Sequence, residues 1–298
     1  MASVDEPTTG QWLLSLLEPG FLLAWAMSYY VKTSLAAVFQ RGQILAPLLE
    51  TRRLRDEAFG KFWIKFSSNR EGAIESAQPP PDQSTPLTPP EVQTSSDLIP
   101  PVLAQASGLV LDVGPGTGTQ MPLLRSPAIK AIYGAEPCHG LHEELRARAD
   151  ANGLGDKYFV LPCSVEGSEL APALQKHGLT RTNEGVFDTI VCVRVLCSLP
   201  NMQQSLNELY ALLRPGGKLL ITEHVVNPWR TSKGSVVARV VQALYGALGW
   251  SFYIGDCCLN RDTEKALRQA GEWESVELDR WFGRTVFPYI SGVLVKKA

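Results

Sequence analysis

From residue 103 onward, short apolar runs alternate with stretches that have helical spacing. The apolar runs lie at residues 108–113, 131–136, 158–163, 187–193 and 217–225, and the helical stretches at 117–125, 139–152, 166–177 and 201–214. This alternation is typical of βαβ units, whose parallel strands form a sheet that helices cover on both faces. Two extended runs within residues 273–298, joined by a short turn containing glycine, predict a closing antiparallel pair. We therefore expect an α/β domain built on a mostly parallel sheet.

Two segments precede the domain that this pattern predicts at residues 103–298. Residues 71–102 are rich in proline, serine, threonine and glutamine, with eight prolines between 71 and 101. A segment of this composition cannot build a core, so we predict a flexible or extended linker. Within residues 1–70, a mixed-charge stretch at 51–66 has apolar side chains at four-residue spacing and predicts an amphipathic helix that packs on the domain. These side chains are Leu54, Ala58, Phe62 and Phe66.

The apolar segment at residues 11–39 has two interpretations. Glu18, Pro19 and Lys32 interrupt it, and its uninterrupted run at 21–31 is shorter than the roughly 20 residues of a membrane-spanning helix. It also lacks the basic start and the small-residue cleavage site of a secretory signal. Either it is a buried helix or oligomer-forming arm that covers the core, or it is a membrane-surface anchor with interfacial aromatic side chains. The aromatic residues concerned are Trp12, Trp25, Tyr29 and Tyr30.

Charge and cysteine content narrow the classes of partner. The formal net charge of -2 gives no basic footprint for nucleic acid, so we expect no nucleic-acid partner. The six cysteines form no CxxC pair, and the four histidines add no metal-ligand spacing, so we predict no metal site. Cys163 and Cys192 fall within apolar strands, where a free thiol behaves as a small apolar side chain. We therefore expect reduced cysteines in a chain that faces the cytosol.

The first apolar run ends in an acid and leads into three alternating glycines, LDVGPGTGTQ at residues 111–120. At the carboxyl edge of a parallel sheet such a loop lies where ligands bind, and glycine lets the backbone take positive φ and touch the ligand. A dinucleotide fingerprint would need its third glycine at position 119, which is threonine, and a P-loop would need Gly-Lys-Ser/Thr. The spacing is instead D-x-G-x-G-x-G, from Asp112 to Gly118.

This spacing resembles motif I of the class I S-adenosylmethionine-dependent methyltransferases. GAEP at 134–137 ends the second predicted strand with Glu136, whose carboxylate can accept hydrogen bonds from both ribose hydroxyls. LPCSVE at 161–166 follows the third strand, and ELYALLRPGGKLLITEHV at 208–225 matches the helix, turn and fifth strand of that family. The resemblance implies a Rossmann-like fold with a mostly parallel seven-stranded sheet, an antiparallel C-terminal pair and helices on both faces. It also implies S-adenosylmethionine as the cofactor.

Four further stretches resemble the methyltransferase-like family of membrane-associated alkyl-thiol S-methyltransferases. They are DTIVCVRVLCSLPN (188–201), LLRPGGKLLITEHV (212–225), CCLNRDTEKAL (257–267) and FPYISGVLVKK (287–297). Members of that family carry an apolar N-terminal segment that attaches them to endoplasmic reticulum or lipid-droplet membranes. The resemblance therefore implies an enzyme on the cytoplasmic side that meets a membrane surface through residues 11–39. The proline-rich insert and the shorter spacing around IGDCC depart from the family pattern, which leaves the acceptor open.

Carried over residue by residue, the resemblance assigns cofactor-binding positions to the glycine loop and to the ends of the next three strands. They are Asp112, Gly114, Pro115, Gly116, Gly118, Glu136, Pro137, Cys163, Ser164, Val165, Val193 and Arg194. Two depart from the family, because Pro115 replaces a small residue or cysteine and Arg194 stands where relatives are apolar. Further residues also fall on matching positions, namely Cys192, Cys197, Glu223, His224, Cys258 and Arg261.

Methyl transfer from a sulfonium is an in-line displacement, so the protein mainly has to align the nucleophile with the methyl group. A thiol is already partly ionised and needs only a weak base or a nearby cation, whereas a phenol or alcohol needs a better base. His224, just past the fifth strand, is the candidate base, although a histidine satisfied by local hydrogen bonds fits equally well. Arg194 or Arg261 could stabilise an anionic acceptor or pair with a surface carboxylate, and Asp256 could handle a proton or cap a turn. Cys257 and Cys258 are assigned to packing.

We therefore predict an enzyme that transfers a methyl group from S-adenosylmethionine to a small, lipophilic acceptor. A thiol acceptor rests on the family resemblance, and O- or C-methylation of a natural-product intermediate is the main alternative. A protein of another class would bind the cofactor without methylating, as a pericyclase or a membrane-bound scaffold. Formation of S-adenosylhomocysteine separates the enzyme from this second class.

Overall fold

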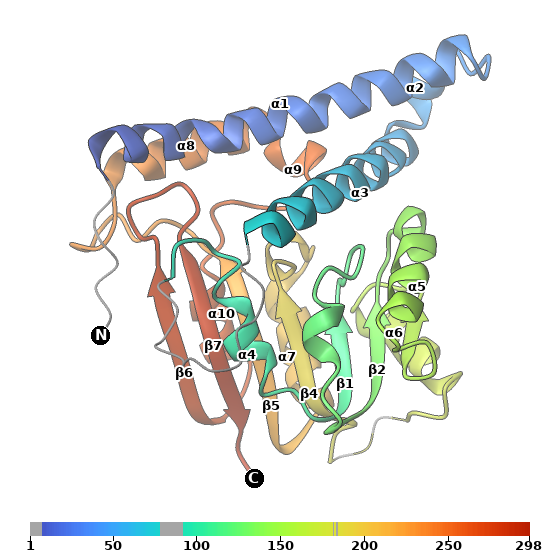
Figure 1. The fold of residues 1–298 in the computed structure, drawn as a ribbon, viewed down its shortest axis with the longest axis vertical. Helices are drawn as coiled ribbons and strands as arrows, with labels where there is room; N and C mark the ends of the chain where they lie inside the picture. The colour runs from blue at the N-terminus through green and yellow to red at the C-terminus, as the bar shows by residue number, and fades with distance from the viewer. Residues whose placement is uncertain (1–7, 78–91, 181, 183) are drawn as a thin grey trace.

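A computed structural model describes residues 8–77, 92–180, 182 and 184–298, and its ribbon is shown in Figure 1. These residues form a seven-stranded sheet with the order β3-β2-β1-β4-β5-β7-β6. The first five strands pair in parallel, which confirms the predicted α/β fold. They are β1 (Gly108–Val113), β2 (Ile129–Ala135), β3 (Tyr158–Leu161), β4 (Phe187–Val193) and β5 (Leu213–His224).

The closing antiparallel pair is also confirmed. Strand β7 (Tyr289–Lys296) lies between β5 and β6 (Trp273–Trp281) and runs antiparallel to both of them. The last strand of the chain therefore enters the sheet beside β5, and β6 forms the edge. This order leaves the carboxyl ends of β1, β2, β4 and β5 at one common edge.

Helices cover both faces of the sheet, as predicted. On one face, α6 (Gly167–Gln175), α7 (Met202–Leu212) and α10 (Thr263–Gln269) contribute Leu170, Leu206 and Leu267 to the core. The other face is covered by α4 (Ile99–Leu103) and α5 (His142–Ala151), which contribute Leu103 and Leu145. Because both faces are buried, the strands are almost continuously apolar rather than alternating.

The helix predicted over residues 117–125 is wrong. This stretch is a loop followed by one short 3-10 helix, η1 (Met121–Leu124). The physical reason is that the stretch available for a helix is short. Gly118, with φ of 79°, and Pro127 leave few residues between them, and Pro122 lacks an N–H group. Met121 and Leu124 nevertheless bury fully against the sheet, so the short helix fills the place of a longer one.

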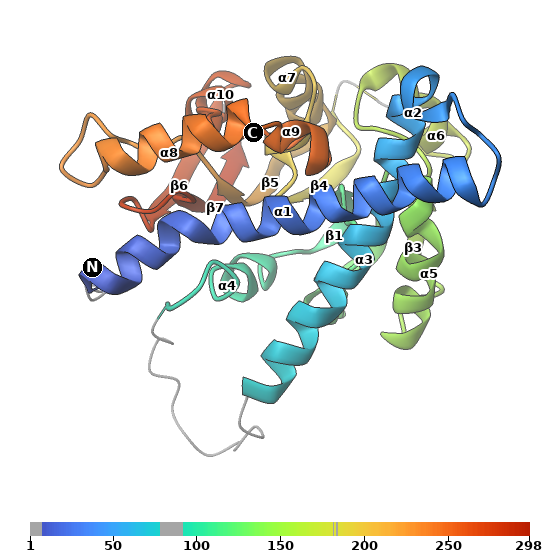
Figure 2. The ribbon, with the colours of Figure 1, turned by 90° about the horizontal axis from the view of Figure 1, so that it is seen from above.

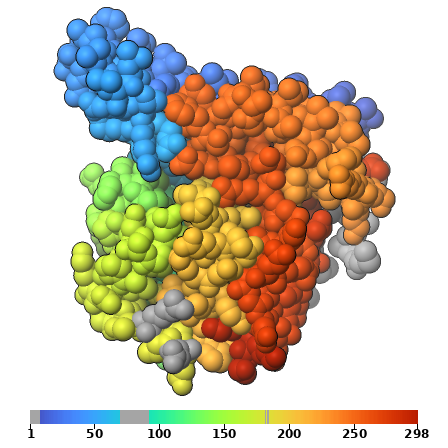
Figure 3. Space-filling model, turned by 180° about the vertical axis from the view of Figure 1, so that it is seen from behind, coloured from blue at the N-terminus to red at the C-terminus, as the bar shows by residue number. Residues whose placement is uncertain are grey.

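A second layer of helices lies across the carboxyl edge of the sheet, as Figure 1 shows and Figure 2 shows from above. We call this layer the cap. It consists of α1 (Thr9–Phe39), α2 (Ala46–Leu49), α3 (Thr51–Ala77), α8 (Val236–Ala247) and α9 (Trp250–Tyr253). Seen from behind, α8 and α9, in orange, lie beside the blue N-terminal helices, so both halves of the chain build the cap (Figure 3).

Aromatic side chains hold the cap together. Phe62 on α3 is fully buried, and its ring contacts Trp25 and Tyr29 of α1 with ring centroids 5.4 and 6.1 Å apart. Leu54 and Ala58 are buried on the same face of α3. The predicted amphipathic helix is therefore present, and its apolar face packs against α1 rather than directly against the sheet.

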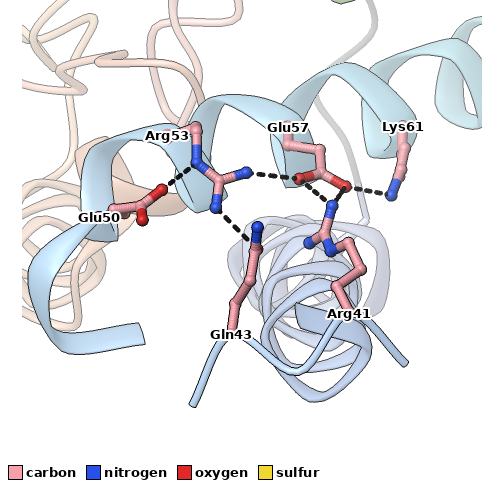
Figure 4. A network of polar contacts seen from close by, with 6 residues as sticks. All are labelled: Arg41, Gln43, Glu50, Arg53, Glu57 and Lys61. Atoms are coloured by element: carbon pink, nitrogen blue, oxygen red, sulfur yellow. Dashed lines mark hydrogen bonds and ion pairs between the residues drawn. The ribbon is translucent and has the colours of Figure 1, made fainter. Parts of the chain in front are cut away.

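Polar contacts fix the turn from α1 into α3 (Figure 4). Arg41, just after α1, donates to both carboxylate oxygens of Glu57 at 3.1 Å, and Lys61 approaches the same carboxylate at 2.7 Å. Arg53 contacts Glu50 and donates to Gln43 at 3.0 Å. Such exposed pairs contribute little each, so the aromatic contacts carry most of the packing.

The proline-rich segment predicted at residues 71–102 overlaps helices at both ends. Helix α3 continues to Ala77, and α4 begins at Ile99. Residues 92–98 form turns that reach the cavity described below. The central part, residues 78–91, lies outside the described residues.

Candidate active site

A cavity of about 1170 Å³ lies between the cap and the carboxyl edge of the sheet. Most of the residues assigned from the sequence line it, and they come from the carboxyl ends of the five parallel strands and from the turn after α9. The assigned residues that line the cavity are Gly114, Gly116, Glu136, Pro137, Ser164, Val165, Arg194, His224 and Asp256. The assigned residues outside its lining are Asp112, Pro115, Gly118, Cys163 and Val193.

The glycine loop is held in a conformation that other residues rarely adopt. Gly114 and Gly116 have φ of 57° and 62°. A Cβ atom on Gly114 would lie 2.4 Å from Cγ2 of Val195, and one on Gly116 would lie 2.8 Å from Nε1 of Trp63. Both the backbone geometry and the crowding therefore require glycine at these two positions, and both residues line the cavity.

Glu136, at the end of β2, faces the glycine loop. Its carboxylate accepts hydrogen bonds from the Gly116 N–H at 2.9 Å and from the Cys138 N–H at 2.8 Å. The residue is only 5% exposed, and burial raises the pKa of its carboxyl. A buried carboxylate beside open backbone at the edge of the sheet is suited to accept hydroxyl groups of a nucleoside ribose.

Asp112 lies beneath the loop. The Tyr158 hydroxyl donates to its carboxylate at 2.8 Å, and burial raises the pKa of Asp112 to about 6. The side chain does not line the cavity, so its contact is with the structure that supports the loop. Tyr158 is the first residue of β3, and this bond therefore ties β3 to the end of β1.

The residues after β3 divide between core and cavity. Val165 is buried and lines the cavity, and the Ser164 N–H is fixed by the Glu169 carboxylate at 2.8 Å. Cys163 instead packs into the core beneath α6, and Val193 packs on the opposite face of the sheet. Ser164 and Val165 are thus the members of this group that a bound adenine could touch.

Another part of the cavity lining carries two thiols and an imidazole. Cys197 follows β4, His224 ends β5 and Cys257 follows α9, and all three are buried and line the cavity. Their ligand-forming atoms lie within 4.8 Å of one another, and His224 Nε2 is 3.1 Å from Cys257 Sγ. We call these residues the Cys–His–Cys wall. Spacing along the sequence did not indicate it, because its members are far apart in the chain.

Glu223 was not assigned to the site, yet it shapes one side of the cavity. It is fully buried, and one carboxylate oxygen accepts from the Val195 N–H at 2.6 Å and from the Leu196 N–H at 2.9 Å. This contact fixes the loop after β4, which carries Val195 against Gly114 and Cys197 into the wall. Burial raises the pKa of Glu223 to about 7.

Arg194 and Asp256 both have positive φ, 57° and 61°, and both bind structural partners. Arg194 donates to the Ser95 hydroxyl at 2.9 Å and lies 5.7 Å from the centre of the Tyr289 ring. Asp256 forms a two-point ion pair with Arg55 of α3 at 2.8 and 3.0 Å. The arginine thus holds the segment before α4, and the aspartate holds the cap.

Aromatic side chains of α3 close the cavity over the glycine loop. Trp63 contacts Gly116, and its ring stacks on Phe59 with a centroid separation of 5.6 Å. Phe66 lies beside them, 5.4 Å from the Trp63 ring. The sequence did not point to Trp63, since the four-residue spacing in this helix follows its buried face and Trp63 lies next to that face.

Residues 93–274 match a protein family described as a methyltransferase domain, and the chain belongs to this family. It is therefore an S-adenosylmethionine-dependent methyltransferase, as the sheet order, the glycine loop and Glu136 indicated.

Among individual proteins, the chain is similar to the human thiol S-methyltransferases TMT1B and TMT1A. It is 36% identical to TMT1B over 120 residues, which are 38% of this chain and 45% of that protein. It is 32% identical to TMT1A over 90 residues, which are 29% of this chain and 33% of that protein. The chain thus spans less than half the length of the curated relatives it matches.

Solved structures share the fold at low sequence identity. One is a possible exported protein from Bordetella parapertussis, with a TM-score of 0.52, 15% identity, and coverage of 93% of this chain and 97% of that one. Another is an O-methyltransferase family protein from Burkholderia thailandensis, with a TM-score of 0.51, 15% identity, and coverage of 95% and 72%. These likenesses extend over the cap as well as the sheet, and they show the fold alone.

Proposed function

We propose that this methyltransferase acts on the sulfur of a small, lipophilic thiol. The observation that carries the proposal is the position of His224. Its imidazole is buried in the lining of the same cavity as the glycine loop, and its Nε2 atom is 3.1 Å from Cys257 Sγ. We propose that a nucleophile held beside His224 meets the methyl group of a cofactor held at the glycine loop, because an in-line displacement needs the two to be aligned.

The cofactor side of the cavity is assigned by the same reasoning. We propose that Glu136 binds the ribose hydroxyls, that Gly114 and Gly116 contact the adenosyl group through their backbone, and that Ser164 and Val165 border the adenine. Asp112, Pro115 and Gly118 would support the loop, and Pro137, Cys163 and Val193 would shape its surroundings. The crowded positive-φ glycines and the buried carboxylate support this arrangement.

Apolar and aromatic side chains favour a lipophilic acceptor. The apolar lining residues come from the cap and from the segment before β7. Charged groups line the cavity at the start of α3, among them Arg52, Arg53 and Arg55. Desolvation in an apolar site disfavours a charged acceptor unless it is paired. The apolar lining residues are Leu22, Phe59, Trp63, Phe66, Trp250, Ile254 and Phe287.

We assign His224 as the residue that helps the acceptor thiol to ionise, and Arg194 and Asp256 as positioning residues. A thiol needs only modest help to ionise, whereas a phenol or alcohol needs a strong base. The contacts of Arg194 with Ser95 and of Asp256 with Arg55 support roles in holding the segments around the cavity.

Matched thiol, alcohol and phenol acceptors test which acceptor atom is methylated. The full chain is incubated with methyl-labelled S-adenosylmethionine and matched aliphatic thiols, alcohols and phenols, and both S-adenosylhomocysteine and the methylated product are measured. The proposal expects thioether formation from the thiols at a kcat/KM at least tenfold above that of the matched phenols. Faster methylation of oxygen or carbon acceptors would contradict it.

We also propose that the outer face of the cap lies on a phospholipid surface. By length and composition α1 is long enough and apolar enough to cross a membrane. Its inner face, however, packs on α3, α8 and α9, and leucine side chains of its outer face are half to two-thirds exposed. We therefore propose that α1 lies in the plane of the membrane surface, as amphipathic interfacial helices do.

The exposed apolar face continues from α1 onto α2 and α8. Tyr245 of α8 donates to the Leu16 carbonyl of α1 at 3.0 Å, which keeps these two helices side by side. Basic residues, Lys32 and Arg41, flank this face and suit an anionic lipid surface. Its exposed members are Leu13, Leu14, Leu17, Phe21, Met27, Val31, Leu35, Phe39, Ile44, Leu45, Leu48, Leu49, Val236, Val237, Val240, Leu244 and Leu248.

A further inference from the structure

The Cys–His–Cys wall has the composition and dimensions of a metal site. Cys197, His224 and Cys257 come from three separate segments, and their Sγ and ring nitrogen atoms converge within 4.8 Å. In a tetrahedral zinc site, Zn–S distances of about 2.3 Å and Zn–N distances of about 2.0 Å place ligand atoms roughly 3.5 to 3.8 Å apart. The observed separations therefore need only small side-chain adjustments to surround an ion.

Two further observations point to a ligand at this place. His224 is 5% exposed, and its Nδ1 atom has no hydrogen-bond partner among the described residues, so its buried imidazole is not satisfied by the protein alone. The three residues also line the cavity together, so an ion between them would have one side open to the acceptor. Catalytic zinc sites keep such an open fourth position, whereas structural ones are closed by the protein.

The charges also balance. Two thiolates and one neutral imidazole neutralise a divalent cation, which makes the occupied site acceptable in a buried, apolar surrounding. Sulfur ligands select a soft or borderline cation such as Zn²⁺ over Mg²⁺ or Ca²⁺. These three ligands are therefore suited to bind zinc, and the bound zinc is suited to accept a sulfur atom as its fourth ligand.

We propose that Cys197, His224 and Cys257 bind one Zn²⁺ ion and that the acceptor thiol occupies its fourth position. The assignment of the acceptor thiol to the fourth position rests on the proposed thiol specificity. Here a ring nitrogen of His224 is a metal ligand rather than a proton acceptor. Cys258, next in sequence to Cys257, lies instead against Arg261 and stays outside the site.

The reaction balances without any further reagent. The S–H bond of the acceptor breaks as its sulfur is bound, and the proton passes to solvent. A lone pair of that sulfur then forms a bond to the methyl carbon, while the bond from this carbon to the sulfonium sulfur breaks and its electrons remain on S-adenosylhomocysteine. The neutral thioether product is a weak ligand and leaves. Matched alcohols compete poorly because the site favours sulfur.

Metal content tests the site without reference to activity. The full chain is purified in zinc-containing buffer without chelator, and its metal is counted by mass spectrometry. The apo protein is then titrated with Co²⁺, whose tetrahedral thiolate complexes give characteristic visible and near-ultraviolet bands. The proposal expects one zinc per chain and a tetrahedral cobalt spectrum. A wild-type chain that holds no stoichiometric zinc and gives no such spectrum would overturn it.

Variants locate the site. Cys257→Ser and His224→Gln are expected to lower zinc affinity at least 100-fold, and Cys258→Ser, the neighbouring control, is expected to bind as the wild type does. Calorimetric binding of S-adenosylhomocysteine shows that each variant is folded. Equal zinc affinity in Cys257→Ser and the wild type would place the metal elsewhere and overturn the assignment.

Acceptor binding separates this inference from the proposed function. Addition of an aliphatic thiol to the cobalt-loaded chain is expected to shift the charge-transfer bands, and the matched alcohol is expected to leave them unchanged. A chain that methylates thiols at full rate without metal would overturn the zinc inference and leave the proposed function standing. A zinc-loaded chain that methylates phenols but not thiols would overturn the proposed function, and absence of a spectral shift with thiol would overturn the open-position assignment.

Discussion

Two buried carboxylates on either side of the glycine loop have different tasks. Glu136 accepts from the backbone of the loop and lines the cavity, whereas Asp112 accepts from Tyr158 beneath the loop and does not. Both are more than nine-tenths buried, and burial raises the pKa of each carboxyl. We therefore propose that Glu136 binds the ligand and that Asp112 supports the backbone of the glycine loop.

Glu136→Gln is expected to weaken binding of S-adenosylhomocysteine about 10- to 100-fold, because hydrogen bonds to a charged acceptor contribute about 1.5 to 3 kcal/mol. Calorimetry measures the dissociation constant directly. Glu143→Gln, at an exposed position of α5, is the matched control and is expected to bind as the wild type does. Unchanged affinity in Glu136→Gln would remove Glu136 from the ribose site.

Asp112 is expected to make stability depend on pH. Its pKa rises from 3.8 in the unfolded chain to about 6 in the fold, so folding disfavours its charged form. The resulting cost is absent when the carboxyl is protonated, below about pH 4. It grows as pH rises and reaches about 3 kcal/mol above about pH 6.

Asp112→Asn removes this cost while its amide oxygen can still accept from Tyr158. The variant is expected to match the wild type in urea unfolding at pH 4 and to exceed its free energy of unfolding by up to about 3 kcal/mol at pH 7.5. Asp156→Asn, at an exposed turn, should show no such pH-dependent difference. A stability difference that is equal at both pH values would contradict the assignment.

Helix α3 joins the cap to the sheet because its two apolar faces have different partners. Phe62 and its neighbours pack on α1, whereas Trp63 reaches Gly116 and helps to cover the glycine loop. Asp256 adds an ion pair with Arg55 of the same helix, and both residues line the cavity. Opening of the cap and access to the cofactor loop therefore depend on the same helix.

Phe62→Ala is expected to loosen the cap, since removal of a buried aromatic ring costs about 3 to 5 kcal/mol. Limited proteolysis should cleave the N-terminal helices at least tenfold faster and leave a resistant fragment that contains the sheet. Ile64→Ala, at a half-exposed position of the same helix, serves as the control. Equal cleavage rates in Phe62→Ala and the wild type would show that the ring does not hold the cap.

Strand positions could be predicted from the sequence because buried parallel strands leave a local signal. The predicted bounds of β1 and β4 agree with the structure, and the glycine loop and Glu136 follow from residue type and spacing. The predicted helix at 117–125 failed because Pro122 and the short length of the stretch before Pro127 outweigh its apolar pattern.

Much of the site could not be predicted, because residues distant in sequence create it. Cys197, His224 and Cys257 meet only when three loops converge, and the contact of Trp63 with Gly116 depends on how the cap docks. The position of Glu223 next to His224 in a motif could have pointed to it. Its hydrogen bonds with the backbone of Val195 and Leu196 could be found only from the structure.

The cavity lies directly beneath the cap, whose outer face is apolar and exposed. Ser15 and Leu22 of α1 line the cavity, while Leu14 and Phe21 on the other side of the same helix are 62% and 72% exposed. A lipophilic acceptor dissolved in a bilayer would thus be one helix away from the site. Figure 2 shows α1 and α8 running side by side across this surface.

Vesicle flotation tests the membrane surface. The wild type is expected to float with vesicles of phosphatidylcholine and phosphatidylserine, and Phe21→Glu or Leu244→Glu should lower the bound fraction about tenfold, since each loses about 1.5 to 3 kcal/mol of apolar burial. Both side chains are exposed, so the fold should be unaffected. Lys157→Gln, in the turn before β3, changes the net charge by the same single unit and is the matched control. Equal flotation of all four proteins would argue against this surface.

A crystal structure with bound S-adenosylhomocysteine tests most directly whether the cofactor and the acceptor face each other across this cavity. We expect the ribose hydroxyls within hydrogen-bond distance of Glu136, the adenosyl group against Gly114 and Gly116, and the sulfur turned toward His224 with room between them for a thiol. A cofactor product bound outside the cavity, or with its sulfur turned away from the Cys–His–Cys wall, would contradict the account.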